Sequence, residues 1–106
     1  MNESLNKLAE ICYTVSFNNG WHTPETRTFG DYIALMHSEL SEALEAYREA
    51  HAGLGGIDEH VKEELADTII RILDFCGCYK LDIEAAVLAK IEINRGRPYR
   101  HGGKAI

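Results

Sequence analysis

Four acidic residues stand in two pairs of equal spacing and could together bind a divalent cation. Glu39 and Glu42 lie three residues apart, and so do Glu64 and Asp67. Residues three apart share one side of a helix, so each pair can direct both carboxylates to one ion. Carboxylates held close together repel and raise one another's pKa, a penalty that a cation removes. Ligand sets made of oxygen alone are typical of Mg²⁺ and Mn²⁺.

Solvated acids and a di-iron centre are the two alternatives to such a site. Acidic residues on helices are commonly solvated or salt-bridged, and Asp67 and Arg71 have the i,i+4 spacing of a helical ion pair. A ferritin-like di-iron site needs Glu-x-x-His pairs, but no Glu of this chain is followed by His three residues later. This excludes a di-iron site. Two interpretations of the repeated acidic pair remain, a Mg²⁺ or Mn²⁺ site and a set of solvated acids.

Charge is unevenly distributed along the chain. Residues 1–89 contain 6 basic and 16 acidic side chains, whereas residues 90–106 combine one acidic residue with five basic ones: Lys90, Arg95, Arg97, Arg100 and Lys104. An acidic body argues against a duplex nucleic acid partner, which needs a basic face. A basic tail beside carboxylates suits a phosphate-bearing ligand bridged by metal ions. A simpler reason for the tail is that basic residues favour the C-terminal end of a helix because of its dipole.

The acidic pairs are expected to lie on helices of an all-α fold. Apolar residues recur at helical spacing in four segments, at about 4–17, 28–50, 58–78 and 82–96. Thr28, Asp58 and Asp82 are suitable N-cap residues, and Pro98 follows the last segment. No segment alternates with period two for long enough to predict a strand. We therefore predict one domain, residues 1–106, with a four-helix bundle-like architecture.

Helical wheels predict which side of the two central helices is buried. The apolar arc of 28–50 contains Tyr32, Met36, Leu40, Ala43, Leu44 and Tyr47. The apolar stripe of 58–78 contains Val61, Leu65, Ile69, Ile72 and Cys76, widened by Ile70 and Leu73. The four acids lie at the edges of these arcs, so antiparallel packing would bring them face to face. A domain this small cannot cover so much apolar surface, so we predict a homodimer or larger assembly with both helices in its interface.

The composition is that of an ordinary folded protein without a membrane span. Hydrophobic residues make up 45% of the chain and charged residues 26%, and no apolar run approaches the roughly 18 residues that a span requires. The first residues, 1–4, lack the basic and apolar regions of a secretion signal. Cys12, Cys76 and Cys78 are an odd number without a Cys-x-x-Cys motif, which favours reduced thiols. We therefore expect a cytoplasmic protein.

The acidic motifs resemble the signature of a known family. Glu39-x-x-Glu42 followed by Glu64-x-x-Asp67 is similar to the motif of the MazG-like all-α nucleoside triphosphate pyrophosphohydrolases, and the segment 62–67, Lys-Glu-Glu-Leu-Ala-Asp, is especially so. The resemblance covers nearly the whole chain. It extends to Lys90-x-x-x-Asn94-x-x-Arg97, to Tyr99-Arg-His-Gly-Gly-Lys104 and, more loosely, to Trp21-His22-Thr23-Pro24.

This resemblance implies an activity and an assembly. Members of the family cleave a nucleoside triphosphate between its α and β phosphates with Mg²⁺, releasing the monophosphate and pyrophosphate. Their usual role is to remove unwanted or non-canonical nucleotides, so a deoxynucleoside triphosphate is the expected substrate. They tend to form dimers or dimers of dimers. Larger relatives carry two copies of the domain in tandem, whereas this chain has one.

Phosphoryl chemistry gives the acidic and basic residues separate roles. Glu39, Glu42, Glu64 and Asp67 would hold the metal ions, and Lys90, Asn94 and Arg97 would donate hydrogen bonds to phosphate oxygens. Glu45 lies one helical step beyond Glu42 and is a candidate general base, although a water activated directly by the ion needs none.

The resemblance adds further candidates for substrate binding. It implies Tyr99 and Lys104 in the tail, and His22 near the only tryptophan. Trp21 could stack on a base, or it could anchor the core or an interface. From a different class of function, the chain could be a catalytically silent helical oligomerisation module, but such a module has little reason to keep four facing acids.

Overall fold

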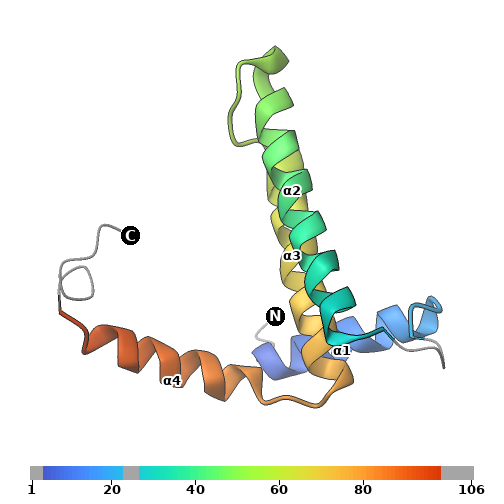
Figure 1. Cartoon of the computed structure of the whole chain (residues 1–106), viewed down its shortest axis with the longest axis vertical. Coiled ribbons are helices and arrows are strands. Elements are labelled where there is room, and N and C mark those ends of the chain that lie inside the picture. Colours follow the sequence, from blue (N-terminus) through green and yellow to red (C-terminus); the bar gives the residue numbers. More distant parts are fainter. Residues whose placement is uncertain (1–3, 23–26, 99–106) are drawn as a thin grey trace.

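A computed structural model describes residues 4–22 and 27–98, and all regular structure in these residues is helical. The helices are α1 (Leu5–Asn18), α2 (Phe29–Gly53), α3 (Glu59–Cys78) and α4 (Ile83–Arg95). Figure 1 shows α2 and α3 side by side as a long antiparallel hairpin, with α1 crossing its base and α4 leading away from it. The predicted all-α class is confirmed.

Three helices begin at the N-cap residues that the sequence suggested, Thr28, Asp58 and Asp82, and α1 begins after Ser4, which was not suggested as a cap. Ser4, Thr28, Asp58 and Asp82 each accept a hydrogen bond from a backbone N–H in the first turn of their helix. Thr28 and Asp31 form a reciprocal capping box. At its other end, α2 leaves the regular helical conformation at Ala50, close to the predicted end, although the element continues to Gly53.

The core is small, and α3 lies at its centre. Both α1 and α2 pack against α3, whereas α4 contacts α1. Buried apolar side chains are mostly small, which lets the helices approach closely; they are Ala9, Tyr32, Ala43, Ala46, Ala50, Val61, Leu73 and Cys76. Gly77 is required where α1 crosses α3, because a Cβ there would lie 2.3 Å from the carbonyl oxygen of Ala9. This close crossing fixes α1 against the C-terminal end of α3.

The helical wheels were wrong about much of the buried surface. In α2 the side chains of Leu40, Leu44 and Tyr47 are exposed, and in α3 those of Leu65, Ile69 and Ile72 are exposed as well. The contact between the two helices instead buries alanines and polar groups, including Glu39 and Thr68. A wheel assigns the widest apolar arc to the inside, but in this single chain these six larger apolar side chains are 38–56% exposed.

No residue of α4 is buried. Its N-terminal end is held to α1 by hydrogen bonds from Asn6 Nδ2 to Asp82 Oδ1 (2.8 Å), from Leu5 N to Glu84 Oε1 (2.7 Å) and from Glu84 N to Asn6 Oδ1 (3.0 Å). Ile83 in its first turn packs against the core, but Val87, Leu88, Ile91 and Ile93 further along are exposed. The helix is therefore anchored at one end and uncovered along its length.

Within the described residues, no helix combines the length and the apolar character needed to cross a membrane. All three cysteines are free thiols. Burial, and then the charge of Asp74, raise the pKa of Cys12, and burial alone raises the pKa of Cys76. These two cysteines are thus neutral thiols near neutral pH, as expected for reduced core residues.

Candidate metal centre and adjoining cavity

The packing of α2 against α3 brings three of the four predicted acids together. Carboxylate oxygens of Glu39, Glu64 and Asp67 all lie within 4.8 Å of one another. Glu39 is buried, Glu64 is partly buried and Asp67 is exposed, so the group runs from the helix interface out to its surface. Three carboxylates at this separation can coordinate one hard divalent cation.

Glu64 carries the clearest sign of a missing partner. Its Oε1 atom lies 3.3 Å from Nε2 of His60, but its Oε2 atom is buried and has no hydrogen-bond partner among the described residues. Burial raises the pKa of Glu64, and the neighbouring carboxylates of Glu42, Asp67 and Glu39 raise it further. A buried, unsatisfied oxygen among like charges is what a bound cation would neutralise.

The fourth acid, Glu42, is exposed and stands outside the group of three, although it is close enough to Glu64 to raise its pKa. Glu45 lies further along α2, where its Oε2 atom is 3.7 Å from Arg48 on the surface. The structure therefore does not bring Glu45 to the three converging acids.

Arg71 neutralises part of this acidic group in a way the spacing did not predict. The sequence suggested an Asp67–Arg71 pair along α3, but the guanidinium bonds across the interface to Glu39 Oε1, with Nε and one terminal nitrogen each at 3.3 Å. The same guanidinium lies 5.7 Å from the ring centre of Trp21. Cross-helix pairing is stronger here because Glu39 is buried and Asp67 is solvated.

A cavity of about 430 Å³ opens beside the acids, between α1 and α3. Glu39, Asp67 and Arg71 form one part of its lining, and Asp74 and Trp21 form others. The remaining wall comes from α1, from its C-cap residue and from one further residue of α3: Ile11, Cys12, Val15, Ser16, Asn19 and Ile70. Trp21 is 52% exposed and lines this cavity, so it is not the core anchor that was one alternative.

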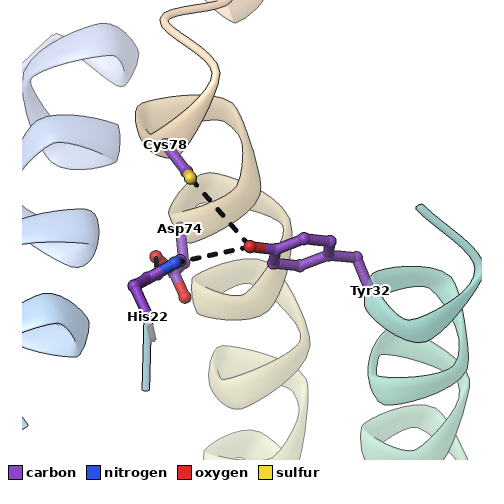
Figure 2. Close-up of polar contacts among 4 residues, drawn as sticks. All are labelled: His22, Tyr32, Asp74 and Cys78. Atoms are coloured by element: carbon purple, nitrogen blue, oxygen red, sulfur yellow. Dashed lines mark hydrogen bonds and ion pairs between the residues drawn. The ribbon is translucent and has the colours of Figure 1, made fainter. Parts of the chain in front are cut away.

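His22 occupies a buried polar network (Figure 2). Its Nε2 atom lies 2.8 Å from Asp74 Oδ1, and its Nδ1 atom lies 3.4 Å from the hydroxyl of Tyr32. That hydroxyl is in turn 4.0 Å from the sulfur of Cys78. Burial and then the contact with Cys78 raise the pKa of Tyr32 to about 12, so its proton is retained at physiological pH. The resemblance suggested His22 as a site residue, but nothing in the spacing indicated Asp74 as its partner.

The predicted phosphate-binding residues do not join the acids within one chain. Lys90 and Asn94 lie on α4, and Arg97 follows it. Figure 1 shows the C-terminal half of α4 well apart from the α2–α3 hairpin that carries the acids. Tyr99 and Lys104 lie outside the described residues.

Two functional candidates were missed by sequence reasoning. Arg71 was assigned to a surface pair, and Asp74 was not singled out, although a carboxylate between Leu73 and Phe75 in an apolar stretch was a usable signal. Comparisons of the chain with protein-family models, curated proteins and solved structures gave no match. The family resemblance therefore rests on the motifs themselves.

Proposed function

We propose that this protein is a Mg²⁺-dependent pyrophosphohydrolase of the MazG-like type. It would add water to a nucleoside triphosphate, with deoxynucleoside triphosphates as the expected substrates, and release the monophosphate and pyrophosphate in the cytoplasm. The observation that carries the proposal is the convergence of Glu39, Glu64 and Asp67 around a buried, unpaired oxygen of Glu64. The motif resemblance supplies the reaction.

The residues present fit a magnesium site. All donors are carboxylate oxygens, the set that Mg²⁺ and Mn²⁺ prefer, and Glu64 has an oxygen in need of a positive partner. Glu39, Glu64 and Asp67 would hold the ion, and Glu42 would help from the rim. When bound, the ion supplies charge neutralisation for the phosphate oxygens.

Arg71 is the cationic side chain best placed to assist. It stands between the acids and Trp21, and its fork of donors suits a phosphate oxygen. Its bond to Glu39 holds the guanidinium at the cavity wall, so a phosphate entering there would meet a donor already in position. This positioning lowers the entropic cost of binding.

We further propose that the assembly is a homodimer or a dimer of dimers in which α4 serves the partner's acids. Lys90, Asn94 and Arg97 lie on or just beyond α4, the helix that leads away from the acids of its own chain. The exposed apolar side chains of α2, α3 and α4 are suited to bury against a second copy. In a two-fold arrangement each α4 would serve the other chain.

Pyrophosphate release tests the proposal. We expect the protein to release pyrophosphate, and not single phosphate, from a mixture of nucleoside triphosphates with Mg²⁺ and not with a chelator. Glu39→Gln should reduce the rate at least about a hundredfold, since even groups that only orient metal ligands contribute about ten- to hundredfold. Glu49→Gln, which changes an exposed acid of the same helix, should keep the wild-type rate.

Release of single phosphate would overturn the proposal, and so would equal activity in the two variants. Absence of any release, together with a stable oligomer, would favour the silent helical module instead. The exposed apolar faces are the observation that keeps this second candidate open.

A further inference from the structure

The cavity beside the acids has the size and lining of a small-molecule site. Its volume of about 430 Å³ falls within the range of roughly 300–1,000 Å³ that such sites occupy. Apolar side chains of Ile11, Val15 and Ile70 form walls, and the indole of Trp21 adds an aromatic surface. Apolar walls with an aromatic ring suit a stacked nucleobase.

Asp74 places a carboxylate in this lining. Its side chain is 93% buried, since only 7% of its surface is accessible. Among the described residues its hydrogen-bond partner is His22 alone, through Oδ1. A carboxylate can accept about four hydrogen bonds, so most of the capacity of Asp74 remains for a ligand. A buried carboxylate with unused acceptor positions favours ligands that carry hydrogen-bond donors.

The network behind Asp74 fixes its orientation. Because the carboxylate accepts, Nε2 of His22 donates to it, while Nδ1 of His22 lies 3.4 Å from the hydroxyl of Tyr32. Tyr32 is itself held by aromatic contact with Phe75, with ring centres 5.0 Å apart. His22 is therefore a positioning residue for Asp74 (Figure 2), and Asp74 lines the cavity with a carboxylate held in place.

The spacing along α3 connects Asp74 to the metal centre. Asp67, Arg71 and Asp74 line the same cavity at intervals of four and three residues, so they share one side of the helix. Seven residues correspond to about 10 Å along a helix axis. That length matches, in order of magnitude, the span from the α-phosphate to the far edge of the base in a nucleotide.

We propose that this cavity binds the nucleobase of the substrate and that Asp74 selects bases with two adjacent N–H donors. Guanine presents such an edge, since its ring N1–H and its exocyclic amino group point in parallel and can both bond to one carboxylate. Adenine and cytosine offer one amino donor beside a ring acceptor, which the carboxylate repels. Uracil and thymine offer one N–H between two carbonyl acceptors. This inference rests on the proposed nucleotide substrate.

The direct test is nucleoside binding without metal or phosphate. Trp21 lines the cavity and is the only tryptophan of the chain, so its fluorescence reports occupancy. The full chain is titrated in chelator with guanosine, inosine, adenosine, cytidine and uridine. We expect guanosine to bind tightest and at least about tenfold tighter than inosine, which lacks the amino group, because a bidentate pair contributes about 1–3 kcal/mol of discrimination.

Asp74→Asn assigns that preference to the carboxylate. The amide still accepts from His22, but it presents a donor to the donors of guanine, so the ratio between guanosine and inosine should fall to near one. Glu49→Gln is the matched control, since it removes an exposed negative charge elsewhere and should leave the ratio unchanged. His22→Ala should reduce the ratio less, because it loosens the carboxylate without removing it.

Equal binding of guanosine and inosine by the wild-type chain would overturn the inference, and this measurement requires no variant to fold. An unchanged ratio in a folded Asp74→Asn chain would also overturn it. Guanosine selectivity without pyrophosphate release would leave the base site standing and overturn the proposed reaction. Pyrophosphate release without base selectivity would leave the proposed reaction standing and overturn the base site.

Discussion

The α2–α3 hairpin and α4 carry the two halves of the predicted site, and they are held in opposite ways. In the hairpin the polar groups lie inside: Glu39 is buried, and Arg71 bonds to it across the interface. In α4 nothing is buried, and the predicted donors Lys90 and Asn94 are exposed. The two helices of the hairpin contact each other extensively, whereas α4 is held only near its N-terminal end, by α1 and by Ile83 against the core.

This difference indicates which half of the site is complete in one chain. The acids converge without help from another copy, so metal binding should be a property of the single chain. The donors of α4 lie apart from those acids, and the apolar side chains around them lack cover within the described residues. Phosphate binding should therefore depend on assembly.

The largest expected effect comes from mixing two inactive variants, one altered in the hairpin and the other in α4. Glu39→Gln removes an acid, and Lys90→Ala combined with Asn94→Ala removes the donors of α4. If α4 serves the partner chain, a refolded equimolar mixture should regain about a quarter of wild-type activity, since half of the dimers are mixed and each has one intact site.

Each variant alone, taken through the same refolding, is the control and should stay inactive. If the mixture also stays inactive while size measurements show mixed dimers, α4 serves its own chain and the comparison fails.

The assembly itself can be broken on the exposed face of α3. Ile69 is 56% exposed, so Ile69→Lys should leave the single chain folded. In a symmetric dimer each copy would lose side-chain burial of about 1.5–3 kcal/mol, which weakens association at least about a hundredfold. Sedimentation at micromolar concentration should show an oligomer for the wild type and a monomer for this variant.

Leu54→Lys provides the matched control, because Leu54 is 89% exposed in the loop between α2 and α3. It changes an apolar side chain to the same charge away from the helix faces and should leave the oligomer intact. A monomeric wild-type protein would refute the predicted assembly.

The sequence was sufficient for the helices and for the acids, because both depend on local rules. N-cap residues such as Thr28 and Asp58 fix where a helix begins whatever it packs against. The i,i+3 spacing likewise places Glu64 and Asp67 on one side of α3 in any fold. These predictions needed no knowledge of neighbouring elements.

The sequence was insufficient where the outcome depends on which face meets which helix. Leu40 and Ile69 belong to apolar arcs, but the single chain leaves both exposed, because small residues such as Ala43 form the close α2–α3 contact. The His22–Asp74 pair joins residues 52 positions apart, so local spacing could not reveal it. Arg71 had two acids within reach, and burial of Glu39 decided between them.

The prediction with the smallest expected effect concerns the stability of the α2–α3 hairpin without metal. The folded state raises the pKa of Glu64 above its ordinary value of 4.5. The protonated carboxyl group therefore stabilises the folded chain fully below pH 4.5, and this contribution to stability is lost as the pH rises through the raised pKa. Glu64→Gln removes this charge. In chelator we therefore expect the variant to melt a few degrees above the wild type at neutral pH, with the difference shrinking as the pH falls.

Thermal melting followed by circular dichroism measures this difference, and adding Mg²⁺ should reverse it. The ion binds the charged form of the wild-type cluster and stabilises it by mass action, whereas the variant has lost a ligand and should gain less. Glu63→Gln changes the neighbouring exposed acid of α3 and should follow the wild type under both conditions. If Glu64→Gln melts below the wild type in chelator at neutral pH, the repulsion among these acids does not limit stability, and Oε2 of Glu64 is satisfied without an ion.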